Sequence, residues 1–280
     1  MSIIKHIKEW NEVIKKEKFI TQKSFKKEEP EIRVAFFDTE TTGLNVDPEK
    51  FKEDNPNRSK VIELAYRVAG FNSKFEMVSL EDGVDLFQEE EISEKITKLT
   101  GIKPEDVKGK SIDWKKVQSD FDSCDYCVAH NANFDSNVLH FVLKLPKTLC
   151  SLRDFNWNNY DLYNHKQEIL ALAAGFHYEA HRAINDVDSL IKIVSHFNCL
   201  PEMIKNANKQ TLRIKGWGGY KFKDFLKLEM KYKPNKIGKD FFWEARLTKE
   251  EMDKHIEIIK KKFKELREYD NQEIGIIILD

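Results

Sequence analysis

Glu31-Ile-Arg-Val-Ala-Phe-Phe-Asp-Thr-Glu-Thr-Thr-Gly-Leu44 joins a run of apolar residues to two carboxylates. The apolar run predicts a buried strand. Asp38 and Glu40 stand two positions apart at its end, and side chains at that spacing point to the same face of a strand. Two neighbouring carboxylates repel one another unless a proton or a cation relieves them. A divalent cation such as Mg²⁺, which prefers carboxylate oxygens and water, is the natural partner for this pair.

The segments that follow predict a mixed sheet covered by helices. A polar, proline-containing loop is expected over residues 45–59 and further strands over 60–71 and 75–87, with a turn at Asn72-Ser73. The remaining expected elements are a helix from Ser111, a strand over 125–130, a helix over 131–143, a strand over 148–154, and helices over 166–175 and 183–198. Consecutive strands followed by alternating helices and strands indicate an α/β fold with a mixed sheet.

The sequence changes character beyond Pro201, and a boundary is expected between residues 201 and 210. A hairpin near residues 237–240, a helix from the capping box at Thr248 to about Tyr269, and a strand over 273–279 predict a small basic α+β domain. At the other end, an apolar stripe predicts an amphipathic helix; it consists of Ile3, Ile7, Trp10 and Ile14. The expected domains are therefore 1–29, a helix and linker; 30–202, the catalytic domain; and 203–280, an accessory domain.

Composition narrows the class of protein. Of the 280 residues, 40% are hydrophobic and 34% are charged, which excludes global disorder. No run of about 18 apolar residues and no secretory signal is found, so no membrane partner is expected. The four cysteines suit reduced thiols and predict a cytoplasmic protein. Cys124 and Cys127 resemble half of a zinc site, but no second close pair exists, which argues against zinc.

Charge is distributed unevenly along the chain. Residues 203–280 contain 19 basic and 13 acidic residues, whereas residues 30–202 contain 20 basic and 30 acidic residues. An acidic catalytic segment beside a basic one suits a metal-dependent enzyme that acts on a polyanion, although ordinary solvated surface gives the same counts.

Two further segments place acids at the ends of expected elements. His130-Asn-Ala-Asn-Phe-Asp135 follows a short strand, and His181-Arg-Ala-Ile-Asn-Asp186 opens a helix. Taken singly, Asp135 and Asp186 are explained as charges at helix N-termini. Asp38 and Glu40 are likewise explained as acids at the edge of a loop, and His181 as a structural histidine. Taken together, four carboxylates and one histidine at element ends can build a two-metal centre.

The three segments, in this order, resemble the exonuclease motifs of the DEDDh (DnaQ-like) superfamily over roughly residues 31–200, and Leu99-Thr-Gly-Ile102 matches a further segment of it. The resemblance implies a ribonuclease H-like fold and a 3′→5′ exonuclease. Such an enzyme releases nucleoside 5′-monophosphates with two Mg²⁺ or Mn²⁺ ions. It also implies that Asp38 bridges both ions, that Glu40 and Asp186 complete one site, and that Asp135 supports the other. His181 would take the proton from the attacking water.

The resemblance further implies that Thr41, Leu44 and Phe134 border the terminal nucleotide. Core packing is a rival explanation for Leu44 and Phe134, and a structural role suits His130 as well as substrate contact does. The expected partner is the 3′ end of a single strand, with DNA favoured and RNA trimming as the alternative. A proofreading subunit that docks to a polymerase or repair partner is a second alternative. An inactive relative is disfavoured because all five catalytic positions are occupied.

The segment from Lys205 to Lys249 contains 13 basic residues against four acidic ones. Aromatic residues lie among them: Trp217, Tyr220, Phe222, Phe225, Tyr232, Phe241, Phe242 and Trp243. Cations that track phosphates and aromatic rings that stack on bases are typical of a single-strand-binding groove. The alternative is a small module in which the aromatic residues form the core and the lysines are solvated.

Overall fold

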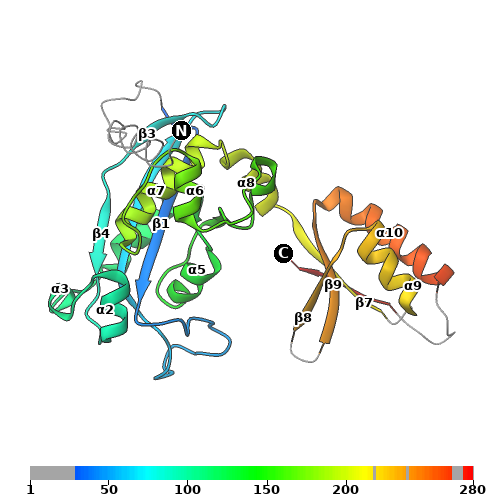
Figure 1. The fold of residues 1–280 in the computed structure, drawn as a ribbon, viewed down its shortest axis with the longest axis horizontal. Helices are drawn as coiled ribbons and strands as arrows, with labels where there is room; N and C mark the ends of the chain where they lie inside the picture. The colour runs from blue at the N-terminus through cyan, green and yellow to red at the C-terminus, as the bar shows by residue number, and fades with distance from the viewer. Residues whose placement is uncertain (1–28, 217–218, 238–239, 267–273, 280) are drawn as a thin grey trace, which may run out of the picture. The chain divides into compact units, whose positions relative to one another are not determined.

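The computed structural model describes residues 29–216, 219–237, 240–266 and 274–279 (Figure 1). The chain divides into two compact units between Ile204 and Lys205. The amphipathic helix expected near the N-terminus lies outside the described residues. Within the described ranges, no helix is both long and apolar enough to cross a membrane.

The first unit is built on a six-stranded mixed sheet. Its strands are β1 (Ile32–Thr41), β2 (Val61–Phe71), β3 (Met77–Leu80), β4 (Val84–Phe87), β5 (Tyr126–Ala129) and β6 (Lys147–Cys150). The order is β3-β2-β1-β5-β6, with β4 also paired to β2. β1 and β2 are antiparallel, whereas β1, β5 and β6 are parallel. The carboxyl ends of β1 and β5 therefore meet at one edge, and the prediction of an α/β mixed sheet is confirmed.

One expected strand is divided in two. The prediction of a single strand over residues 75–87 is wrong, because β3 and β4 pair with different ends of β2 and are separated by residues 81–83. At Gly83 an added Cβ would lie 2.8 Å from Ile184 Cδ1 and 3.1 Å from the guanidinium of Arg67. A side chain at this position would have to displace the ends of these two side chains, which favours a glycine between the two strands.

Helices flank the sheet: α2 (Glu94–Thr100), α3 (Pro104–Val107), α4 (Trp114–Asp122), α5 (Asn133–Leu139), α6 (Gln167–Ala173) and α7 (Ala183–His196), with a 3₁₀ turn η2 (Trp157–Tyr160). The first two were not predicted, because both are short. α4 begins three residues later than expected, since the carboxylate of Asp113 caps it by accepting from Lys115 N and Lys116 N. α5 is shorter than predicted, and α7 packs against β1 and β2.

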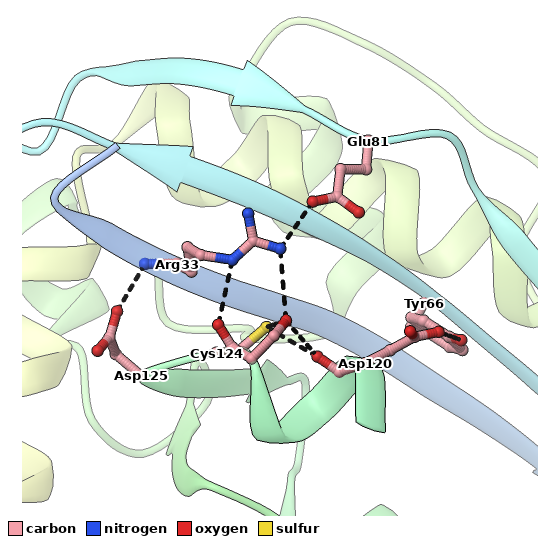
Figure 2. A network of polar contacts seen from close by, with 7 residues as sticks. Arg33, Tyr66, Glu81, Asp120, Cys124 and Asp125 are labelled. Atoms are coloured by element: carbon pink, nitrogen blue, oxygen red, sulfur yellow. Dashed lines mark hydrogen bonds and ion pairs between the residues drawn. The ribbon is translucent and has the colours of Figure 1, made fainter. Parts of the chain in front are cut away.

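The core and a polar network hold β1 in place. Phe37 and Tyr66 meet the ring of Phe121 edge-on, with centroids 5.7 and 5.3 Å away. Figure 2 shows how Arg33 joins β1 to two neighbouring segments, which contain Glu81 and Asp125. Its backbone N donates to Asp125 Oδ2, and its Nη2 donates to Glu81 Oε1, both at 2.8 Å. β1 is thus fixed at its start, and its far end carries the carboxylates.

The second unit is a four-stranded antiparallel sheet with helices. α8 (Leu200–Ala207) spans the division between the units and is followed by β7 (Gln210–Gly216), α9 (Gly219–Asp224), a π-helix η3 (Phe225–Glu229), β8 (Lys233–Ile237), β9 (Asp240–Leu247), α10 (Lys249–Leu266) and β10 (Ile274–Leu279). The sheet order is β10-β7-β9-β8. The predicted hairpin, long helix and terminal strand are confirmed where described; the predicted end of the helix, residues 267–269, lies outside the described residues. Phe222, Phe225 and Tyr232 are core residues.

Candidate active site

Three carboxylates converge at the end of β1. Asp38 and Glu40 come from β1 and Asp186 from the first turn of α7, and each offers an oxygen within 4.8 Å of the others. The pleat of β1 places the first two on one side, and the packing of α7 on β1 brings the third to them. Oxygen ligands at this spacing fit a hard divalent cation such as Mg²⁺ or Mn²⁺.

Asp135 is brought to the same place but is held differently. It is a buried residue in the first turn of α5. Its Oδ1 accepts hydrogen bonds from Thr39 N at 3.1 Å and Thr39 Oγ1 at 2.7 Å. This carboxylate is therefore tied to β1 beside the group of three and stands outside it.

The carboxylate of Asp186 has a donor on each oxygen. The hydroxyl of Tyr178 donates to Oδ1 at 2.7 Å, and the backbone N of His181 donates to Oδ2 at 2.9 Å. Gln167 Nε2 also donates to the carbonyl of Asp186 at 2.7 Å. These bonds fix the orientation of a ligand before any ion arrives, as outer partners of metal ligands do.

His181 adopts a φ of +66°, in the left-handed region that non-glycine residues rarely occupy. This conformation directs its backbone N–H to Asp186, while its exposed side chain lines the same cleft as the carboxylates. Backbone strain of this kind persists where the surrounding structure enforces it, which is common at active sites.

Behind the three carboxylates lies a fully buried acid that the sequence analysis missed. Glu63 of β2 pairs with Glu40 of β1 in the sheet register. Its Oε1 accepts from Arg182 Nε at 3.2 Å and Nη2 at 3.0 Å, and its Oε2 accepts from Ala183 N at 3.1 Å. Glu63 thus caps the start of α7. Glu63 belongs to no motif of the sequence, and it lies near the other acids only because β2 pairs with β1.

The acids of the site resist ionisation when no cation is present. Burial, followed by repulsion from Asp186, raises the pKa of Glu40 to about 8. Burial also raises the pKa of Asp135 to about 7 against the opposing effect of the Thr39 hydrogen bonds. The pKa values of Asp38 and Asp186 are raised by burial as well. A divalent cation would offset these costs and displace the protons, so the residues fit such an ion.

The site opens into a cleft of about 480 Å³. All five predicted catalytic residues line it, together with Thr39, Leu44, His130, Asn131, Phe134, Lys166, Gln167, Glu168 and Ala180. The Leu44 residue is 84% exposed, so core packing does not explain it. Phe134 both lines the cleft and packs against the core. These two residues offer apolar edges beside the carboxylates.

Thr41 lies away from the place that the resemblance implied for it, and His130 makes the structural contact that the sequence left open as one of two alternatives. Thr41 is buried, its Oγ1 donates to the carbonyl of Gly43 at 2.6 Å, and the residue is not among those that line the cleft; Thr39 is. His130 Nδ1 lies 2.8 Å from Ser151 Oγ, and burial lowers its pKa to about 4. His130 is therefore neutral and hydrogen-bonded within the fold, although it reaches the cleft.

Comparison with solved structures gives three relatives with a low identity. Exonuclease I of E. coli in complex with an oligonucleotide is 14% identical, with 85% of this chain and 72% of that chain covered and a TM-score of 0.47. Exonuclease X in complex with 5′ overhanging duplex DNA is 18% identical, with 62% of this chain and 98% of that chain covered and a TM-score of 0.44. A 3′-exonuclease that recognises the histone mRNA stem-loop is 16% identical, with 70% of this chain and 72% of that chain covered and a TM-score of 0.44.

No curated protein matches the chain. The family model RNase_T, described as exonuclease, matches residues 35–194, which is more than half of the chain and contains every residue of the cleft. The chain therefore belongs to this exonuclease family.

Proposed function

We propose that this chain removes nucleotides one at a time from the 3′ end of a single strand, with DNA as its substrate, by two-metal hydrolysis. The observation that carries the proposal is the group of Asp38, Glu40 and Asp186, whose oxygens lie within 4.8 Å of one another in a cleft that His181 also lines. Residues 30–202 would form the catalytic domain and residues 203–280 an accessory domain.

The carboxylates have separate tasks in this proposal. Asp38, Glu40 and Asp186 would hold one Mg²⁺ or Mn²⁺ ion, and Asp135, which Thr39 keeps beside them, would support a second ion through water. When bound, the ions stabilise the charge on the attacking and leaving oxygens of the phosphodiester. The donors on Asp186 keep its carboxylate in place while the charge of the phosphate changes.

The proton and the terminal nucleotide are handled by other residues. His181 would take the proton of the attacking water on its imidazole, a task that its exposure to the cleft permits. The water then attacks phosphorus, the 3′ oxygen of the preceding nucleotide leaves, and a nucleoside 5′-monophosphate is released. Leu44 and Phe134 would flank the terminal base with apolar surface, an arrangement that accepts an unpaired base of any sequence.

Asp38→Asn tests the metal centre. Loss of a metal ligand should lower the rate of hydrolysis by at least about 10³-fold, because each ion contributes several kcal/mol of transition-state stabilisation. The matched control is Asp54→Asn, since Asp54 is exposed and lies outside the cleft. The assay uses end-labelled single-stranded DNA and RNA of one sequence, with Mg²⁺, Mn²⁺ or EDTA, and identifies the released nucleotide by chromatography.

Each outcome of this assay has a defined meaning. Stepwise release of 5′-monophosphates from DNA in metal, and none in EDTA, supports the proposal. Full activity of the Asp38→Asn protein refutes the metal assignment. Faster degradation of RNA than of DNA replaces the proposed substrate by RNA and leaves the site assignment unchanged.

A further inference from the structure

The second unit has a sheet face that lies opposite its helices α9 and α10 (Figure 1). Along the chain its elements run strand, helix, strand, strand, helix, strand, and the strand order β10-β7-β9-β8 puts the first and third strands in the centre. Figure 1 shows α9 and α10 on one side of this sheet. The core on that side contains Leu212 and Ile214 of β7 and Met252, Ile259 and Phe263 of α10.

The register of the strands identifies the residues of the opposite face. Because side chains alternate along a strand, residues next to Leu212 and Ile214 point away from the helices. Arg213 pairs with Glu244 of β9 and with Ile277 of β10, and Glu244 pairs with Lys233 of β8. We call this the open face; its described side chains include Arg213, Lys215, Lys233, Asn235, Phe242, Glu244, Arg246 and Ile277.

An aromatic ring lies between cations at the centre of the open face. Arg213 Cζ lies 5.9 Å and Lys215 Nζ 5.7 Å from the centroid of the Phe242 ring. Phe242 is only 8% exposed. Arg213 Nε donates to Glu244 Oε2 at 2.9 Å, which holds the guanidinium in one orientation beside the ring. A fixed, planar guanidinium next to an aromatic ring is a surface on which a base can stack.

The charge of the open face is strongly one-sided. Its described side chains include four cations (Arg213, Lys215, Lys233 and Arg246) and one acid, Glu244, which is already paired with Arg213. Lys233 and Arg246 are exposed. Cations spread around a stacking surface match a strand that carries a phosphate at every nucleotide and presents unpaired bases.

We propose that the open face of the second unit binds single-stranded nucleic acid, as a surface additional to the catalytic cleft. Lys215, Lys233 and Arg246 contact phosphates, and bases stack on the guanidinium of Arg213, which lies beside the buried ring of Phe242. We call these two side chains the stacking layer. A single strand fits better than a duplex, because the bases of a duplex are stacked on one another and cannot reach a flat sheet. An acidic protein partner would use the cations but would not need the stacking layer.

The proposal is tested by fluorescence anisotropy with the full chain and single-stranded oligonucleotides in EDTA. EDTA prevents cleavage and removes the ions that would hold phosphate in the catalytic cleft, so that binding then reports mainly on other surfaces. The first variant is Lys215→Gln/Lys233→Gln. Its matched control is Lys260→Gln/Lys261→Gln, which removes the same charge from exposed positions of α10, the helix on the other side of the sheet.

Loss of two phosphate contacts should weaken binding. It should also make the negative slope of log affinity against log salt shallower by about 1.4, since each contact to a single strand contributes about 0.7. The control pair should retain the affinity and the slope of the unaltered protein. Equal affinities and slopes for the two double variants would refute the proposal. Binding that falls equally in both would show an unspecific charge effect and would refute it as well.

Phe242→Leu tests the stacking layer separately from charge. It should weaken binding of an oligothymidylate by about fivefold or more without changing the salt slope, because the guanidinium of Arg213 then loses the ring that holds it in place for stacking. Thermal melting checks that the variant is folded. A folded Phe242→Leu protein with unaltered affinity would eliminate the stacking layer. If an acidic peptide, and no oligonucleotide, binds the open face, then the face is a protein-docking surface and the proposal is wrong.

Discussion

Asp186 shows how the site is prepared at the level of single residues. Tyr178 and the backbone of His181 occupy one oxygen each, and Asp135 is held in the same way by Thr39. Hydrogen bonds to a charged carboxylate favour the ionised form, whereas burial opposes it. In both residues burial is the larger effect, so the pKa of each carboxylate is raised although its orientation is fixed. A bound metal ion would favour the ionised form of both carboxylates.

His181→Ala should lower the single-turnover rate of hydrolysis by about 10²–10⁴-fold, the usual contribution of a positioned general base. Substrate binding should change little, because the carboxylates and the apolar edges of the cleft remain. His177→Ala is the control, since His177 is an exposed histidine of the same loop that does not line the cleft. A loss of less than about threefold at saturating metal would show that His181 acts only through its backbone.

The raised pKa values predict a stability that falls with pH in the metal-free protein. Below about pH 4 the acids are protonated in both the folded and the unfolded state. Between that pH and about 8 the unfolded chain loses protons that Glu40 and Asp135 still hold in the folded protein. The folded state then binds more protons, so the free energy of unfolding decreases as pH rises.

Urea unfolding in EDTA at pH 5, 6, 7 and 8 measures this decrease. Glu40→Gln should make the decrease in the free energy of unfolding smaller, because it removes the group whose pKa is raised to about 8. Saturating Mg²⁺ should counteract the decrease, since the ion binds the deprotonated carboxylates and its affinity rises with pH. A metal-free stability that increases from pH 5 to 8 would contradict the assigned direction of these shifts.

At the level of elements, the contact between β2 and α7 determines where the helix that carries Asp186 begins. β1 supplies two carboxylates and α7 the third, so the site depends on how α7 begins. Glu63 of β2 accepts from the backbone N of Ala183 and from the guanidinium of Arg182, the two residues at that point. The side chain of Arg182 is 40% exposed and approaches Asp85 at 3.9 Å. A buried acid thereby orients the start of the helix that holds Asp186.

Arg182→Ala should lower the free energy of unfolding by about 3 kcal/mol. It leaves Glu63 buried without its cation and close to the carboxylates of β1, and breaking a buried ion pair is costly for this reason. Arg153→Ala, at an exposed arginine of the same unit, should change stability by no more than about 0.5 kcal/mol. Urea unfolding at pH 7 compares the two. Equal stabilities would show that the ion pair between Arg182 and Glu63 does not stabilise the fold.

At the level of the whole molecule, the two units have separate cores. The core around Phe37, Tyr66 and Phe121 contains only residues of the first unit, and the core around Ile214, Phe222 and Ile259 only residues of the second. Units with separate cores are able to unfold in separate steps. Metal binding and the open face also belong to different units, which makes their effects distinguishable.

Calorimetry of the full chain should therefore show two transitions, and Mg²⁺ should raise the temperature of one of them alone. Ile259→Ala should lower the temperature of the other transition, because truncation of a fully buried isoleucine costs about 2–5 kcal/mol of stability. Its neighbour Ile258 is 48% exposed, so Ile258→Ala should leave both transitions nearly unchanged. A single transition that moves with both Mg²⁺ and Ile259→Ala would show that the units unfold together.

The sequence by itself determined the features that depend on short-range spacing. Alternation along β1 placed Asp38 and Glu40 on one face, and helix signals placed Asp135 and Asp186 in first turns. These patterns were readable because a strand or helix has a fixed period, so residues a few positions apart share a face whatever packs against them. The mixed sheet and the hairpin of the second unit were predicted for the same reason.

Only the tertiary structure decided which other residues surround and orient the predicted carboxylates. It showed that Glu63 lies behind the site, that Tyr178 and Thr39 orient two of the acids, and that residues 75–87 form two strands. It also placed Phe242 with Arg213 on a face opposite the helices. Such contacts depend on strand register and on packing over long sequence separations. The periodicity of one segment contains no information about its neighbour's position in space.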